Sequence, residues 1–376
     1  MRLNIRKLLG IKNRFSITVV ASESNIDIGK ILMTLVTKNE WETFCELLWR
    51  NVFGKGPSTQ TQRKITTTAR EDAFFNKIIG IIPELALTEV YDSLSPTPGT
   101  LMDGGWFIAS TKGDLNPLSE NGVYVTVTES QPDVFFALYS MLKENVKSDF
   151  FLLKIKSSKI ETEYRTKDIA DIYDIYKFDY NESGQLSFFP SSSDELFKGF
   201  KKKNYVSSHN DPFLPNQLLE QEVTSLPSNL NLRSETLFSI FYDRLFYDFY
   251  LSKHYEKGNS SDIDCITFKN NAFNLIDIKR KYLSKSGKLG ANTEHMPFFE
   301  SLCGWEKFSC YYVANLIPRE QRIDLRLSSD WRYIDMNAFV NSNNIALGRS
   351  GQNTNDDQET NMVSIGDFKK IAHGSS

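Results

Sequence analysis

The sequence lacks the cysteine and histidine patterns that mark common metal-binding domains. Its 376 residues include only four cysteines and four histidines. No two cysteines have the two-residue spacing of a zinc finger, so we expect free thiols and a reducing cytoplasmic compartment. The histidines are also dispersed, and none pairs at metal-ligand spacing. His295 alone lies near the charged segment described below, and we interpret it as a surface or capping residue.

Long apolar runs and phosphate-binding loops are missing as well. No stretch approaches the roughly 18 apolar residues that a membrane-spanning helix needs. The segment MRLNIRKLLGIKNRF is basic, but no apolar signal-peptide core follows it. Neither GxGxxG nor GxxxxGKS occurs. We therefore expect a soluble cytoplasmic protein with no membrane partner.

The composition is that of a folded protein. Hydrophobic residues make up 40% of the chain and aromatic residues 13%, which suits two or three globular domains. The formal net charge is −3, so the chain has no overall basic character. Any surface for nucleic acid must therefore be local.

Changes in residue usage along the chain predict three parts. Residues 1–225 form a mixed α+β domain, residues 226–340 a second domain, and residues 341–376 a polar, partly disordered tail. A β-branched run at 122–130 predicts a strand, and a helix at 131–145 and a strand at 150–158 follow it. The segment before the predicted boundary is rich in Pro, Ser, Asn and Lys.

The second domain contains an unusual charged strand. An aromatic-rich helix is predicted at 234–255, followed by strands at 262–268 and 273–281 that form a hairpin. The second strand contains LIDIKRK, residues 275–281, in which an acid and three cations follow apolar residues. A surface hairpin with one exposed salt bridge would explain the charges but not their apolar neighbours.

Side-chain alternation groups some of these charges on one face. In the second strand Leu275, Asp277 and Lys279 share a face, and in the first strand Asp264 shares one with Ile266. If the two faces coincide, Asp264 and Asp277 meet beside Lys279. Two such carboxylates repel each other, and a divalent cation such as Mg²⁺ relieves the repulsion.

This pattern resembles the PD-(D/E)XK nuclease superfamily, which includes restriction endonucleases. The resemblance covers residues 231–318: SDIDCI at 261–266 is similar to the first acidic strand, and LIDIK at 275–279 to the second. It implies an α/β fold with an αβββαβ restriction-endonuclease-like core. It also implies catalytic roles and a site for Mg²⁺, for which Mn²⁺ substitutes. The catalytic positions are Asp264, Asp277 and Lys279, and the metal positions are Asp264, Asp277 and Ile278.

Further family features are matched less closely. The family adds an acid from the preceding helix, for which Asp243 is the first candidate and Glu235 the second. The family's proline before the first acid is missing here. A helix at 292–308 and a strand at 310–317 fill the places that follow the lysine strand, provided that Pro297 sits early in the helix.

A cluster of cations follows the lysine strand. Between residues 279 and 288 there are five cations and no acid, with Tyr282 among them and two glycines nearby. Such a segment suits contacts with a phosphate backbone, although a solvated basic loop has the same composition. The candidates for nucleic-acid binding are Arg280, Lys281, Lys285 and Lys288.

Together these features predict a Mg²⁺-dependent endonuclease acting on DNA in prokaryotic restriction or anti-phage defence. The N-terminal domain would recognise the target, sense a ligand or hold a defence-system partner protein, and a homodimer would allow both strands to be cut. Two alternatives remain open. One is an RNA-directed nuclease with the same site, and the other is a non-catalytic nucleic-acid-binding or regulatory protein that retains the fold.

Overall fold

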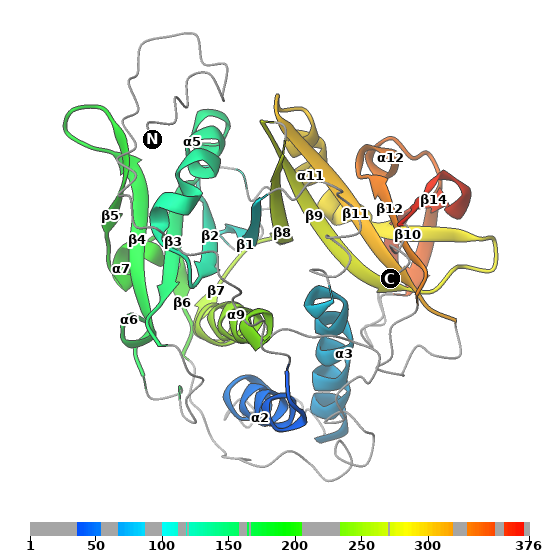
Figure 1. The fold of residues 1–376 in the computed structure, drawn as a ribbon, viewed down its shortest axis with the longest axis horizontal. Helices are drawn as coiled ribbons and strands as arrows, with labels where there is room; N and C mark the ends of the chain where they lie inside the picture. The colour runs from blue at the N-terminus through cyan, green and yellow to red at the C-terminus, as the bar shows by residue number, and fades with distance from the viewer. Residues whose placement is uncertain are drawn as a thin grey trace, which may run out of the picture.

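The computed structural model describes the chain in sections that together form a mixed α/β fold. The described sections cover most of the chain from residue 36 to residue 371. They are residues 36–53, 67–86, 100–111, 118, 120–157, 164, 167–204, 234–269, 271–318, 329–349 and 357–371. Figure 1 shows a curved sheet crossing the molecule with helices on both of its sides.

One ten-stranded mixed sheet organises the protein, in the order β15-β12-β11-β9-β8-β1-β2-β3-β4-β5. Its first half in sequence comprises β1 (Thr100–Ala109), β2 (Gly122–Thr128), β3 (Asp149–Ile155), β4 (Tyr173–Tyr180) and β5 (Leu186–Pro190). Its second half comprises β8 (Ser260–Lys269), β9 (Ala272–Lys281), β11 (Phe308–Leu316), β12 (Trp331–Asp335) and β15 (Lys369–Lys370). The boundary predicted near residue 225 therefore does not separate two sheets.

Helices cover the two faces of this sheet with separate apolar cores. On one face lie α2 (Lys38–Leu48), α3 (Thr67–Leu85) and α9 (Ser234–Arg244), which continues through η3 (Leu245–Leu251) and α10 (Ser252–His254). On the other face lie α5 (Phe136–Asn145), α11 (Met296–Cys303) and α12 (Asn337–Val340). The aromatic residues predicted for the 234–255 helix supply much of the first core, since Phe241, Tyr242 and Leu245 are fully buried there.

Most of the elements predicted from periodicity are present. The strands at 122–130 and 150–158 correspond to β2 and β3, and a short helix η2 (Pro132–Phe135) leads into α5. The predicted helix at 292–308 is shorter, beginning with η4 (Thr293–His295) and ending at Cys303. Pro297 lies in the first turn of α11, where its missing N–H has no helical partner to lose. The apolar spacing within residues 25–53 also predicts a helix; α2 occupies residues 38–48 of it, and residues 25–35 lie outside the described chain.

The arrangement around the charged hairpin is a helix, two antiparallel strands, a crossover helix and a parallel strand. β8 and β9 are antiparallel, and β11 returns beside β9 in the parallel direction after α11. The other neighbour of β8 is β1, which comes from the N-terminal half of the chain. Between β9 and α11 lies β10 (Lys288–Asn292), which pairs with β14 (Asp357–Ser364) in a separate sheet.

The segment expected to be a polar tail contributes to the fold. β13 (Ile345–Arg349) and β14 form a three-stranded sheet with β10, and η6 (Ile365–Asp367) leads to β15 at the edge of the large sheet. Val363, Phe368 and Ile371 are buried. These apolar residues are widely spaced among polar ones, so the overall composition of the segment concealed them. Residues 350–356 and 372–376 lie outside the described chain.

Several short elements remain. They are η1 (Trp49–Phe53), α6 (Ile169–Ile172), α7 (Ser193–Leu196), and the two-residue strands β6 (Lys201–Lys202) and β7 (Tyr255–Glu256). None of the helices in the described sections combines the length and apolar character needed to cross a bilayer.

Candidate functional site

The charged residues gather where β8 and β9 separate. Within the described residues the pairing of the two strands runs from Lys269 opposite Ala272 to Cys265 opposite Ile276. Beyond this point β8 stays paired with β1. A Cβ at Gly104 would lie 1.7 Å from the carbonyl oxygen of Ile263, so glycine is needed for the close approach of β1 to β8. The strands therefore open on the β9 side at Asp264.

The side chain of Asp264 occupies the opening. Its Oδ2 accepts a hydrogen bond of 2.5 Å from the backbone N–H of Ile278, which the neighbouring strand would otherwise satisfy. Its side chain is only 3% exposed. A carboxylate thus replaces a strand carbonyl at this position, which ties Asp264 to β9.

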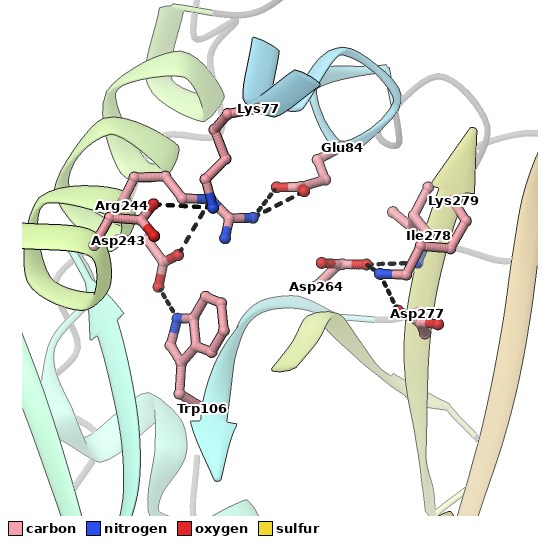
Figure 2. Close-up of polar contacts among 10 residues, drawn as sticks. Lys77, Glu84, Trp106, Asp243, Arg244, Asp264, Asp277, Ile278 and Lys279 are labelled. Atoms are coloured by element: carbon pink, nitrogen blue, oxygen red, sulfur yellow. Dashed lines mark hydrogen bonds and ion pairs between the residues drawn. The ribbon is translucent and has the colours of Figure 1, made fainter. Parts of the chain in front are cut away.

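Lys279 brings the two predicted acids together. Its Nζ lies 2.5 Å from Asp277 Oδ1 and 3.8 Å from Asp264 Oδ2 (Figure 2). The ammonium side chain is 36% exposed, whereas the side chain of Asp277 is 9% exposed. The structure therefore places all three predicted catalytic residues within reach of one cation-sized position.

The expected alternation along β8 is broken at this point. Ile263 and Ile266 both pack in the core beneath α11, although residues three apart should face opposite sides of a regular strand. Asp264 instead lines a cavity on the α9 side together with Cys265 and Ile278. The prediction that Asp264 shares a face with Ile266 is therefore wrong, because the strand is irregular where it leaves β9.

Asp264 and Asp277 consequently border two different cavities. The larger, of about 300 Å³, lies on the α9 side and is bordered by Asp264, Asp243 and Glu84. The smaller, of about 180 Å³, lies on the α11 side and is bordered by Asp277, Lys279 and Lys281. Asp262 borders both. The opening between β8 and β9 thus connects two sets of charged groups.

Burial and neighbouring charges shift the pKa values of the site residues. Burial raises the pKa of Asp264 well above its usual value, and neighbouring acids add to this against the opposing effect of Lys279. Burial alone would lower the pKa of Lys279, but Asp264 and Asp277 raise it well above its usual value. Lys279 therefore stays charged, and a further positive charge would stabilise the ionised form of Asp264.

The predicted helix acid Asp243 lies in the larger cavity, beside a buried arginine. Its Oδ1 accepts a 2.8 Å hydrogen bond from Trp106 Nε1, and Arg244 Nε lies 4.0 Å from its Oδ2. Burial raises its pKa to about 7. The second candidate, Glu235, lies in the first turn of α9, and its side chain is outside the described part of the structure.

Glu84 is an acid that the sequence did not single out. It lies near the end of α3, and its two carboxylate oxygens accept bonds of 2.9 and 3.1 Å from Arg244 (Figure 2). The guanidinium also lies 5.3 Å from the centre of the Trp106 ring. No spacing rule connects residue 84 with residue 244, so only the tertiary structure places Glu84 beside Asp264.

The four predicted nucleic-acid-binding residues are not equally placed. Lys281 lines the smaller cavity with Lys279, two residues before it on the same face of β9. Arg280 is on the opposite face, and neither cavity includes it. Lys285 is exposed in the turn after β9, and Lys288 begins β10. Only Lys281 of the four lines a cavity at the site.

His295 lines the smaller cavity rather than the open surface. It is half-buried at the start of α11, and its Nδ1 lies 3.0 Å from Ser261 Oγ. Its side chain makes no capping hydrogen bond to the helix. It occupies the N-cap position of α11, as a capping residue would, but the hydrogen bond of its ring goes to Ser261. The position of His295 after a polar turn gave no sign of this, because the strand pairing of β10 determines it.

The donor set is compatible with Mg²⁺. Among the described residues there is no group of three or more His, Cys, Asp or Glu side chains placed to hold a metal ion. Mg²⁺, however, is commonly held by one or two carboxylates, with waters and substrate phosphate oxygens completing its coordination. Asp264 and Asp277, which already share one cation, supply two such hard oxygen ligands.

Comparison of the chain with models of protein families, with curated proteins and with solved structures finds no match.

Proposed function

We propose that the protein is a Mg²⁺-dependent endonuclease that hydrolyses phosphodiester bonds in DNA. The observation that carries the proposal is the position of the Lys279 ammonium, which lies within ion-pair distance of both Asp264 and Asp277. An acid and a cation two residues apart, facing a second acid across a strand opening, can act together on one phosphodiester group.

Each residue has a distinct role in this proposal. Asp264 and Asp277 hold the metal ion, which when bound polarises a phosphate oxygen and lowers the pKa of a coordinated water. Asp264 is fixed by its hydrogen bond to Ile278 N–H. Lys279, partly exposed, would turn from the carboxylates toward the phosphate. There it would orient the attacking water and stabilise the charge that develops on the phosphate oxygens.

The order of the surrounding elements supports the same proposal. A helix, two antiparallel strands, a crossover helix and a strand parallel to the second match five of the six elements of the αβββαβ core that the resemblance implies. The remaining core strand would be β1, which lies beside β8 although it precedes α9 in sequence. This would be an αβββαβ-like arrangement in which one strand comes from the N-terminal half.

The direct test is cleavage of supercoiled plasmid by the purified protein with and without Mg²⁺. We expect nicked and linear products with Mg²⁺ or Mn²⁺, and none after addition of EDTA. Ca²⁺ should support binding with little turnover, as the family resemblance implies. Absence of products under every cation, with a protein that binds DNA, would instead favour a non-catalytic binding or regulatory role.

Matched substrates distinguish DNA from RNA as the target. The same sequence prepared as duplex DNA, single-stranded DNA and single-stranded RNA should be cleaved in that order of preference. Faster cleavage of the RNA would identify an RNA-directed nuclease that uses the same residues.

A further inference from the structure

The smaller cavity beside Asp277 has donors that the proposed cleavage step does not use. Its volume of about 180 Å³ is many times the 10–15 Å³ that one water molecule requires. Its lining includes the apolar side chains of Met296, Phe299 and Met336 together with polar groups. A small group with an acceptor-rich head therefore fits it better than a purely apolar ligand.

Tyr312 provides the clearest evidence for a missing ligand. It lies on β11 directly beside Asp277 of β9, and the residue is 1% exposed. The residue borders the cavity, and its buried hydroxyl has no hydrogen-bond partner in the described structure. Burial, followed by the charge of Asp277, raises its pKa, so the hydroxyl keeps its proton and acts as a donor. A buried donor without an acceptor is costly, and an acceptor from a ligand would satisfy it.

Lys281 is a second donor on the same wall. Among the described acids, none lies within ion-pair distance of its ammonium group, and it lines the cavity with Tyr312. Burial and the nearby charge of Lys279 lower its pKa, which an anion in the cavity would reverse. His295 and Ser261, joined at 3.0 Å, complete the polar part of this wall.

The acids that border the cavity are already balanced in part by other cations. Asp277 pairs with Lys279 at 2.5 Å. Burial alone would raise the pKa of Asp262, but Lys279 and then Arg244 lower it, so this carboxylate remains ionised beside positive charge. The groups that still require a partner are therefore the donors Tyr312 and Lys281.

We propose that this cavity binds a phosphate group, with Tyr312 and Lys281 as its principal donors and His295 with Ser261 at its edge. Only the source of this phosphate rests on the proposed function. In a nuclease, it would be the phosphate next to the one that is cleaved, on the same nucleic-acid strand. Binding there would fix the strand so that the cleaved bond lies beside Asp277 and Lys279.

The test is calorimetric titration of the protein with inorganic phosphate at fixed ionic strength, in EDTA and again in Ca²⁺. The variants are Tyr312→Phe and Lys281→Gln. The matched control is Tyr311→Phe, which removes the same hydroxyl from the preceding residue of β11, on the opposite face of the sheet. We expect Tyr312→Phe and Lys281→Gln each to weaken phosphate binding about fivefold to tenfold, the effect of one lost hydrogen bond or ion contact.

Thermal unfolding without phosphate separates a ligand-binding role from a structural one. Because the Tyr312 hydroxyl has no partner in the free protein, Tyr312→Phe should leave the melting temperature unchanged or raise it slightly. Equal phosphate affinity in Tyr312→Phe and Tyr311→Phe, or a clear fall in melting temperature for Tyr312→Phe, would overturn the inference. If DNA is never cleaved but phosphate affinity falls as expected, the anion site stands and the nuclease proposal fails.

Discussion

Two cations at the centre of the molecule make similar contacts in very different environments. Lys279 and Arg244 each lie between two carboxyl groups, on the two sides of the opening between β8 and β9. The side chain of Lys279 is 36% exposed, and that of Arg244 is 6% exposed. Arg244 also lies over the ring of Trp106, which further fixes its position.

The difference indicates which cluster can exchange its cation. The Lys279 ammonium is partly exposed and can turn toward solvent, but its two carboxyl partners are buried, so it can leave them at small cost only when another cation takes its place. A buried guanidinium bound to Glu84 cannot move without leaving charges unpaired, at a cost of about 3–5 kcal/mol. We infer that the Lys279 cluster performs chemistry and that the Arg244 cluster holds α3 and α9 against the sheet.

The largest expected effect is the loss of cleavage when the Lys279 cluster is changed. Asp277→Asn and Lys279→Ala should each lower the cleavage rate by a factor of about 100 or more, because charge stabilisation at the reacting group is lost. Circular dichroism should show a folded protein in both cases. Asp174→Asn, which changes an acid of β4 in a surface ion pair, is the control and should cleave at the normal rate. Normal cleavage by both site variants would refute the assignment of these residues.

The Arg244 cluster should respond through stability instead. Arg244→Met removes one partner of a buried pair and should lower the free energy of unfolding by about 3–5 kcal/mol, measured by urea denaturation. Lys147→Met is the matched control: its partner is Glu120 at 2.8 Å, both side chains are more than two-thirds exposed, and the free energy of unfolding should stay unchanged. Similar losses for the two variants would contradict the proposed division between the clusters.

Metal binding should distinguish the clusters without any activity measurement. Mg²⁺ at about ten times its dissociation constant should stabilise the fold by about 1.4 kcal/mol, seen as a higher melting temperature. Asp264→Asn and Asp277→Asn should abolish this increase, because each removes a hard oxygen ligand. Glu84→Gln should lower the melting temperature without metal but should keep the increase on adding Mg²⁺. The reason is that the Glu84 carboxylate already accepts hydrogen bonds from Arg244. Loss of the increase in Glu84→Gln would place the metal in the larger cavity.

Local patterns predicted the hairpin and its residues, whereas long-range packing determined the rest of the site. Alternation placed Asp277 and Lys279 on one face of β9, as the structure has them. It failed for Asp264, because the position of Gly104 in a distant strand determines where β8 leaves β9. Glu84, Tyr312 and His295 reach the site through α3, β11 and the pairing of β10 with β14. No rule based on nearby residues connects these segments.

The smallest expected effect concerns the pH dependence that Asp243 contributes. Its pKa of about 7 in the folded protein lies above the ordinary value of 3.8, so the native state binds this proton more tightly than the unfolded chain does. Its contribution to stability is therefore full below about pH 4, falls as the pH rises toward 7, and is lost above that.

The variant Asp243→Asn keeps the oxygen that accepts the hydrogen bond from Trp106, but it removes this dependence of stability on pH. Because the Asp243 side chain is 26% exposed, we expect a modest gain over the unaltered protein, about 1–2 kcal/mol at pH 8 and close to zero at pH 4. Urea denaturation at the two pH values measures this difference, and subtracting the two proteins cancels the similar contribution of Asp264. An equal difference at both pH values would show that the pKa of Asp243 is not raised in the native state, and its carboxylate would then be ionised at neutral pH and available as a third metal ligand in the larger cavity.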